Sequence, residues 1–246
     1  MTISPPDLRI RRDADEIALA DWRRRRRRRL VLKIIIPLLV LLLIAAGVWA
    51  VGFSSLLAVQ SVGVSGAKLV TADQIRQTAA VPNGAPLARV DLDAIHDRVA
   101  GIRQVESVSV ERAWPHSVQI KVVERTPVYF VQDGGSYLLV DRYGVGFQTT
   151  ASAPGKLPRA EVDTGNGQLL KPLAVVAEAL PAELAHKVDR IEASTRDSIQ
   201  LKLADGDTVF WGSEEQSELK AEVIVALLKQ KGTHYDVSAP GNPAVR

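Results

Sequence analysis

The chain has 246 residues, a net charge of +3 and no cysteine. This length fits one large or two small domains, and the absence of cysteine excludes disulfide frameworks, iron–sulfur clusters and thiolate zinc sites. Residues 1–52 hold 11 Lys and Arg against 5 Asp and Glu, whereas residues 53–246 hold 20 against 23. A nucleic-acid-binding domain concentrates basic residues on its folded part, and this sequence places them in its first segment instead.

The first 53 residues read as a tail followed by a membrane helix. Residues 1–29 are polar and are predicted to form a largely disordered cytoplasmic tail. Residues 34–51 carry no charge and are rich in Leu, Ile and Val. A helix of that length spans about 27 Å, close to the hydrocarbon thickness of a bilayer. We therefore predict a transmembrane helix over residues 30–53, with Trp49 and Phe53 in the aromatic belt at its far end.

A block of seven arginines sets the predicted orientation of this helix. Such a block resists translocation and is favourable beside anionic headgroups, so the N-terminus should stay cytoplasmic and the large domain should lie outside. A cleaved signal peptide is an alternative, but its apolar core is usually about 7–15 residues, and Trp49 is bulky for a cleavage site. A buried core helix, or nucleic-acid binding by the arginines, would also fit parts of this segment. The residues assigned to topology are Arg23, Arg24, Arg25, Arg26, Arg27, Arg28, Arg29 and Lys33.

The next segment alternates between strand and helix signals. Residues 59–64 alternate as a strand does, and Thr71 has the residue type and spacing of a helix N-cap. Asp91 is positioned to cap a second helix, whose apolar face is Leu92, Ile95 and Val99. Residues 105–112 and 118–123 alternate again, around a Trp-Pro-His turn. The predicted order is β-α-α-β-β, with two helices covering one face of a three-stranded sheet.

The remaining residues predict a β-rich second part. Asp-Gly-Gly at residues 133–135 separates two apolar runs and indicates a hairpin. Helices are expected over residues 169–180 and 216–229, the second with Leu219, Val223 and Leu227 on its apolar face. Strands are expected over residues 188–191, 198–203, 208–211 and 235–238. The fold class is therefore α+β: a single-pass membrane helix, then a β-α-α-β-β domain and a mixed β-rich domain with flanking helices.

Several motifs resemble one family of bacterial cell-division proteins. The β-α-α-β-β order behind a membrane helix resembles a polypeptide-transport-associated (POTRA) domain. Glu-Arg-Ala-Trp-Pro at residues 111–115 and Glu-Arg-Thr-Pro at 124–127 resemble the FtsQ/DivIB family, as do Val-Asp-Arg-Tyr-Gly at 140–144 and Leu157-Pro158. The resemblance implies a POTRA domain over residues 57–125 and an FtsQ-type β-domain over 126–246. It also implies a type II protein of the bacterial plasma (inner) membrane, located at the division septum.

No set of residues indicates catalysis or a cofactor. The histidines His96, His116, His186 and His234 lack metal-ligand spacing, and no nucleophile elbow, P-loop or dinucleotide fingerprint is present. We therefore predict no enzyme activity, cofactor, metal, nucleic acid or small-molecule substrate. Glu124, Arg125 and Pro127 are interpreted as a structural joint between the two domains, because Pro127 keeps Thr126 extended.

A free strand edge is the remaining means of binding. Residues 235–246 could accept a partner's strand, with prolines limiting uncontrolled pairing; a frayed tail is the alternative. The resemblance implies FtsB/DivIC-like and FtsL-like partners, and a septal synthase is a further candidate. The residues carried over for partner contact are Tyr235, Asp236, Val237, Ser238, Ala244, Val245, Arg246 and Lys220. For recruitment to the septum they are Val62, Val64 and Ile75.

The leading hypothesis is therefore a non-enzymatic scaffold that gathers division partners and helps control septal cell-wall synthesis. The alternative is a POTRA-bearing component of protein export or outer-membrane assembly. Proteins of that kind usually carry several POTRA copies or a barrel of ~10-residue alternating strands. This sequence predicts one copy and no barrel.

Overall fold

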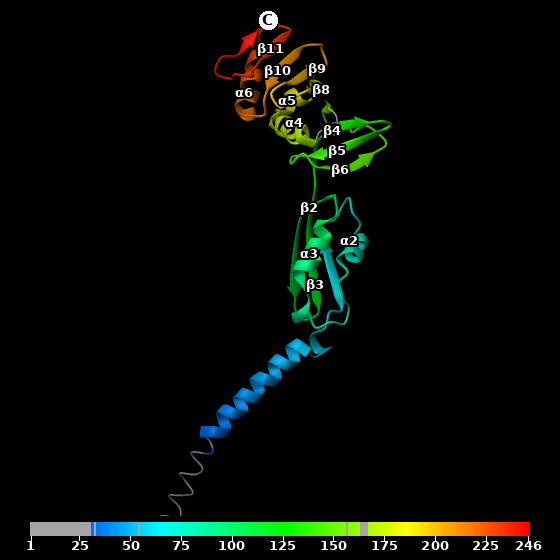
Figure 1. Cartoon of the computed structure of the whole chain (residues 1–246), viewed down its shortest axis with the longest axis vertical. Helices are drawn as coiled ribbons and strands as arrows, with labels where there is room; N and C mark the ends of the chain where they lie inside the picture. Colours follow the sequence, from blue (N-terminus) through cyan, green and yellow to red (C-terminus); the bar gives the residue numbers. More distant parts are fainter. Residues whose placement is uncertain (1–30, 32, 54, 156, 163–166) are drawn as a thin grey trace, which may run out of the picture. The chain divides into compact units, whose positions relative to one another are not determined.

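The computed structural model describes residue 31 and residues 33–53, 55–155, 157–162 and 167–246. The predicted tail and the topology residues Arg23 to Arg29 lie outside the described residues. Within the described part, one helix, Lys33–Phe53, is long and apolar enough to cross a membrane (Figure 1). Its 21 residues span about 32 Å at the α-helical rise, in agreement with the predicted transmembrane helix.

Contacts within the chain divide it into two compact units. The first comprises Met1–Gly63, Val81–Asp91 and Glu111–Val118. The second comprises Val64–Ala80, Leu92–Val110 and Gln119–Arg246.

The segment after the membrane helix has the predicted β-α-α-β-β order, with short 3₁₀ turns between elements. Its three-stranded sheet has the order β1-β3-β2. The elements are η1 (Ser55–Leu57), β1 (Ser61–Ser65), α2 (Ala72–Ala79), η2 (Leu87–Arg89), α3 (Leu92–Ala100), β2 (Val105–Ala113) and β3 (Ser117–Glu124).

Local sequence signals account for these elements. The Thr71 side chain accepts a hydrogen bond from the Gln74 backbone N–H at 3.2 Å, so the predicted N-cap of α2 is confirmed. Helix α3 buries Ile95 and Val99, two of the three residues predicted for its apolar face. Strand β3 buries Val118, Ile120 and Val122, as an alternating strand with one covered face does.

The rest of the chain builds a nine-stranded sheet, with α4, α5 and α6 as its helices. The strand order is β12-β11-β10-β9-β8-β7-β4-β5-β6. The first half contains β4 (Pro127–Asp133), β5 (Ser136–Asp141), β6 (Gly146–Thr150), β7 (Arg159–Glu161), α4 (Gly167–Ala179) and α5 (Ala182–Ala185). The second half contains β8 (Val188–Ala193), β9 (Ile199–Leu203), β10 (Thr208–Gly212), α6 (Ser217–Leu227), β11 (His234–Asp236) and β12 (Ala244–Val245).

The main core of this sheet lies on the face that α4 and α6 cover. Trp211 and Tyr129 are its largest fully buried apolar side chains, and Leu173 and Ile224 join them from the two helices. A smaller cluster of Phe130, Leu139 and Phe147 forms separately on β4, β5 and β6. Burial of this apolar surface supplies the main driving force for folding.

Two sequence predictions for this region are wrong in detail. Leu219 was predicted on the buried face of α6, but it is 46% exposed, and the helix buries Lys220, Ala221, Ile224 and Leu227 instead. Helix α6 carries apolar residues on most of its own sides, so the periodicity of its sequence alone does not select the face that is buried. The strand predicted last, over residues 235–238, is β11 and is followed by β12.

Candidate functional site

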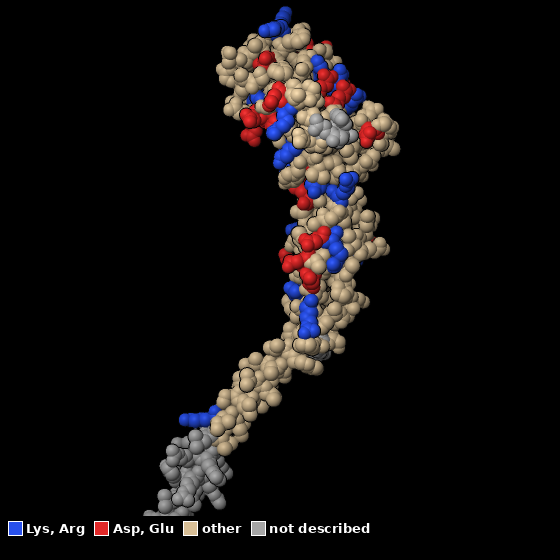
Figure 2. All heavy atoms as spheres, viewed as in Figure 1, with Lys and Arg blue, Asp and Glu red and all other residues tan. Residues whose placement is uncertain are grey.

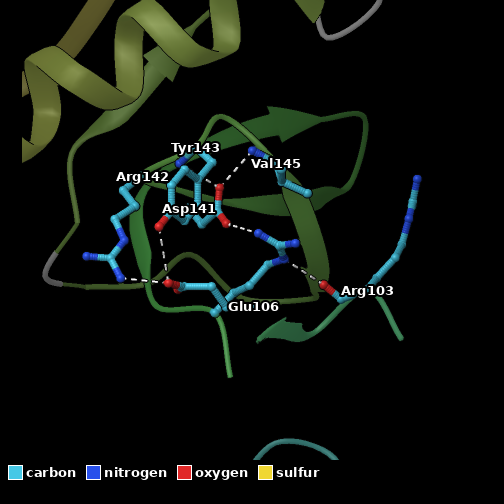
Figure 3. Close-up of polar contacts among 7 residues, drawn as sticks. Arg103, Glu106, Asp141, Arg142, Tyr143 and Val145 are labelled. Carbon is cyan, nitrogen blue, oxygen red and sulfur yellow. Dashed lines mark hydrogen bonds and ion pairs between the residues drawn. The ribbon is translucent and has the colours of Figure 1, made fainter. Parts of the chain in front are cut away.

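The first candidate site is the buried carboxylate of Asp141, the last residue of β5 in the nine-stranded sheet. Asp141 is completely buried, and one of its oxygens, Oδ1, accepts hydrogen bonds from the backbone N–H groups of Tyr143 (2.9 Å) and Val145 (2.8 Å). The other oxygen, Oδ2, pairs with the Arg125 guanidinium (Figure 3). A buried carboxylate with all these partners is held in one position.

Arg125 connects this carboxylate to the turn before β2. Its Nε donates to the Arg103 carbonyl at 3.0 Å, and its backbone N–H donates to the Gln104 carbonyl at 2.8 Å. A second ion pair lies beside it, since Arg142 donates to Glu106 at 2.7 Å (Figure 3). All of these residues belong to the second compact unit. The donors and acceptors of this cluster form hydrogen bonds and ion pairs with one another, so the cluster is suited to structural support.

Gly144 allows the turn beside Asp141 to pack closely. Its φ is +77°, and a Cβ built there would lie 2.5 Å from the backbone nitrogen of Lys171 on α4. On the same helix, the Leu170 carbonyl accepts a hydrogen bond from the Tyr129 hydroxyl at 2.9 Å. Burial, and then the nearby charge of Asp141, raises the pKa of Tyr129. The hydroxyl therefore stays protonated and serves as a fixed donor.

The second candidate site is the edge of the sheet at β12. Strand β11 runs parallel to β10 and antiparallel to β12, so β11 is interior. Among the described residues, no strand pairs with the outer side of β12. The Arg246 backbone bonds inward to the N–H of Thr233 and to both backbone groups of His234. Because alternate residues of a strand point their N–H and C=O to opposite sides, those of Val245 face outward.

A hollow of about 280 Å³ lies next to this edge. Phe210 is half-buried in it, on the sheet face opposite Val209 and Trp211, which are fully buried. The ionisable residues His234, Asp236 and Arg246 also line the hollow. The full lining is Gln200, Thr208, Phe210, His234, Tyr235, Asp236, Ala244 and Arg246. Outward backbone groups beside a hollow that combines an aromatic ring with polar and charged side chains can accept a strand and one of its side chains.

No group of three or more His, Cys, Asp or Glu in the described part of the chain is arranged to hold a metal ion. The acidic and basic residues of the Asp141 cluster are paired with one another or with backbone groups. The Asp141 cluster is therefore suited to structural support, and the β12 edge is suited to binding.

Comparisons with known proteins identify the family. The family model described as "POTRA domain, FtsQ-type" matches residues 57–125, and "Cell division protein FtsQ/DivIB, C-terminal" matches residues 129–239. A curated "Cell division protein FtsQ" from Streptomyces venezuelae is 41% identical over 213 residues, which cover 82% of this chain and 79% of that relative. The chain belongs to the FtsQ/DivIB family.

Other FtsQ proteins show similar agreement. The relative from Streptomyces griseus is 39% identical over 204 residues, covering 78% of this chain and 98% of that protein. The relative from Mycolicibacterium smegmatis is 39% identical over 196 residues, covering 79% of this chain and 59% of that protein. The solved extracytoplasmic domain of DivIB from Geobacillus stearothermophilus aligns with 42% of this chain and 91% of its own, at 20% identity and a TM-score of 0.35.

Within this FtsQ/DivIB chain, some of the residues predicted for partner contact lie at the free edge, and others do not. Ala244 and Val245 form β12 and Arg246 follows them. Tyr235 and Val237 are 4% and 0% exposed, so their side chains belong to the core. Asp236 and Ser238 are exposed, and Asp236 Oδ1 accepts hydrogen bonds from the Ser238 backbone N–H and hydroxyl.

Lys220 is a core residue, which corrects its assignment as a contact residue. It is 2% exposed, and its Nζ donates to the Ser213 carbonyl at 2.9 Å. Burial lowers the pKa of Lys220, although Glu215, Glu214 and Asp236 oppose this shift. Lys220 was carried over from the family resemblance, and a charged residue on a helix usually lies on a solvated face.

The predicted recruitment residues also differ in their exposure to solvent. Ile75 lies on the buried face of α2, fully buried, and is not available to a partner. Val62 and Val64 are half-buried on β1, which is an edge strand of the three-stranded sheet.

Of the residues predicted for the joint, Arg125 bonds to Asp141, Arg103 and Gln104, all within the second compact unit. The Glu124 carboxylate instead accepts hydrogen bonds of 2.8–2.9 Å from the backbone N–H groups of Lys68, Leu69 and Val70, ahead of α2. Burial opposes the charged form of Glu124, but these N–H groups favour it and hold its pKa below the ordinary value. Pro127 begins β4 and lies opposite Asp141 in the ladder.

Asp141 and Phe210 were not singled out from the sequence. A signal for Asp141 was available, because its Val-Asp-Arg-Tyr-Gly motif forms part of the family resemblance. Phe210 lies in an alternating strand, and a half-exposed aromatic residue cannot be told from a core residue by alternation alone.

Proposed function

We propose that this FtsQ/DivIB chain is a membrane-anchored, non-enzymatic scaffold of the bacterial division machinery. In this proposal the chain is divided into a cytoplasmic tail (1–29), a membrane helix (30–53), a POTRA domain (57–125) and a β-domain (126–246). The helix Lys33–Phe53 anchors the chain, the arginine block holds the tail in the cytoplasm, and the folded part is extracytoplasmic.

The observation that carries the proposal is the outward-facing edge of β12 beside the hollow at Phe210. Strand addition supplies main-chain hydrogen bonds for affinity, and a side-chain pocket next to the edge supplies specificity. We infer that an extended segment of an FtsB/DivIC-like protein pairs with Val245 and places one apolar side chain over Phe210. An FtsL-like protein would join through the same assembly, which would link the scaffold to septal cell-wall synthesis.

The short β12 is compatible with controlled binding. Two residues form the strand, and Pro240, Gly241 and Pro243 precede it. A short edge next to prolines does not readily template uncontrolled pairing. A partner that brings its own compatible strand can therefore use the edge without making it an aggregation site.

Location and partner capture in cells test this function. We expect the full chain, fused at its N-terminus to a fluorescent protein, to form a band at mid-cell, and its depletion to give filamentous or branched cells. Co-purification from membranes should recover FtsB/DivIC-like and FtsL-like proteins. A uniform membrane signal together with normal division after depletion would contradict the proposal.

Deleting all of residues 235–246 would be a poor test of the edge. Tyr235 and Val237 are buried, and the Tyr235 hydroxyl donates to the carbonyls of Gln230 and Gly232. Their loss would damage the core, so reduced binding could not be assigned to the edge. A backbone change at Val245 is more selective.

A further inference from the structure

The turn between β2 and β3 carries an exposed tryptophan close to where the chain leaves the membrane helix. Trp114 is 51% exposed. The backbone carbonyl of His116, two residues later, accepts a hydrogen bond from the Gln60 N–H at 2.8 Å, and the His116 ring Nδ1 lies 3.3 Å from the Ala58 carbonyl. All of these residues belong to the first compact unit, which also contains the membrane helix.

A second loop packs against the same stretch of chain. The Val59 N–H donates to the Ala85 carbonyl and the Gly84 N–H donates to the Val59 carbonyl, each at 2.9 Å. The Arg89 guanidinium lies 3.8 Å from the centroid of the Phe53 ring, at the last residue of the membrane helix. These contacts hold the Trp114 turn and the loop beside the segment that follows the helix.

The distance from the helix to the turn is short. Four residues separate Phe53 from Ala58, and even fully extended the five steps between them span no more than about 18 Å. The polar headgroup layer adds roughly 5–8 Å to each side of the hydrocarbon core. The turn is therefore within reach of the membrane surface.

The composition around the turn suits a lipid interface. Residues 54–61, 81–86 and 113–117 contain no Lys, Arg, Asp or Glu. In Figure 2 the surface next to the end of the helix shows tan atoms beside a patch of blue, basic atoms on the side in view. Trp49 and Phe53 at the end of the helix are 63% and 59% exposed, so an aromatic belt already begins there. An indole next to uncharged neighbours favours the headgroup layer, where its ring is covered and its N–H stays hydrated.

We propose that the Trp114 turn is a second membrane contact, with the indole in the headgroup layer of the leaflet in which the helix ends. The helix would anchor the chain, and Trp114 would limit how far the first compact unit can swing away from the bilayer. This inference depends on the proposed membrane anchoring but not on the direction of insertion or on any protein partner.

Tryptophan quenching in vesicles tests the contact. The full chain is reconstituted in phosphatidylethanolamine–phosphatidylglycerol vesicles with acyl chains brominated near the headgroups. The W22F/W49F variant retains Trp114 and the fully buried Trp211. We expect brominated lipid to reduce its emission, and W22F/W49F/W114F to show no such loss. Equal emission from W22F/W49F in brominated and unbrominated vesicles would overturn the inference.

The W22F/W114F variant separates this failure from a failure of anchoring. Trp49 lies in the helix, so its quenching reports insertion. Quenching of Trp49 without quenching of Trp114 would disprove the second contact and leave the anchor intact. Absence of quenching in both variants would contradict the anchor itself and the contact with it.

A spin label gives a second measurement that keeps Trp114 in place. The chain has no cysteine, so Asn83→Cys and Ser107→Cys each provide one labelling site. Both positions are exposed, the first in the loop beside the turn and the second on β2 in the other compact unit. We expect lipid-like oxygen accessibility at position 83 only, and its loss when Trp114→Ser is added. Water-like accessibility at position 83 in the parent protein would contradict the proposal.

Discussion

The buried Asp141 cluster and the β12 edge are opposite ways of using polar groups. Asp141 is fully buried, and its two oxygens take an arginine and two backbone N–H groups. At β12 the backbone groups of Val245 face away from the sheet, next to the hollow that Phe210 helps to line. A polar group whose partners all come from its own chain stabilises the fold, whereas one that still lacks a partner is available for binding.

The largest expected effect is from Asp141→Ala. The change leaves Arg125 without its carboxylate and two N–H groups without their acceptor. We expect the free energy of unfolding to fall by about 3–5 kcal/mol, measured by urea unfolding of the full chain in detergent micelles. Asp133→Ala is the control, because Asp133 is exposed in the β4–β5 hairpin. Equal stability of the two variants would show that the cluster is not a structural support.

Gly144→Ala tests the turn beside Asp141. An alanine there meets both the φ of +77° and the backbone of Lys171. We expect a loss of about 2–4 kcal/mol in the free energy of unfolding. Gly134→Ala is the matched control, since Gly134 has a φ of +58° but no neighbouring atom within 4 Å of the added Cβ. Its cost should be only about 1 kcal/mol, and a similar cost at both positions would exclude close packing as the cause.

Val245→Pro tests the edge, and Val245→Ala controls for the loss of the Val245 side chain, which packs against the main core. Proline removes the outward N–H and keeps the inward bonds of Arg246 to His234. We expect at least a tenfold loss of affinity for an FtsB/DivIC-like partner, about 1.4 kcal/mol, measured by titration calorimetry. Val245→Ala keeps the N–H and should retain binding. Unchanged affinity of the proline variant would remove β12 from the proposed interface.

The smallest effect concerns Glu124 and has a defined dependence on pH. Three backbone N–H groups hold the pKa of Glu124 below its ordinary value of 4.5. A carboxylate with a lowered pKa stabilises the folded state above its ordinary pKa, and this stabilisation is lost as the pH falls through the lowered value. We expect Glu124→Gln to cost about 1 kcal/mol at pH 7, with the difference from the parent protein shrinking as the pH falls below the ordinary value. Urea unfolding at a series of pH values measures it.

The control for this pH dependence is Glu222→Gln, at an exposed position on α6. Its difference from the parent protein should stay within about 0.5 kcal/mol at every pH. A Glu124→Gln cost that does not change with pH would mean that the carboxylate's charge contributes nothing to stability.

Much of the fold was predictable where one short-range signal was sufficient. The cap at Thr71 and the hairpin around Gly134 were found where residue type predicted them. Strands β6 and β7 were not predicted. β7 has only three residues and pairs with β4 and β8, which are distant in sequence, so no local pattern marks it.

The sequence by itself determined the membrane helix, the order of the main elements and the family. Each of these features depends on runs and motifs of neighbouring residues, and such local patterns can be interpreted from the sequence without knowing the fold. Only the tertiary structure decided that Lys220 and Tyr235 are buried, that β11 is interior and that Asp141 pairs with Arg125. Those outcomes depend on which distant segments pack together, and burial and pairing across a sheet are properties of the assembled fold.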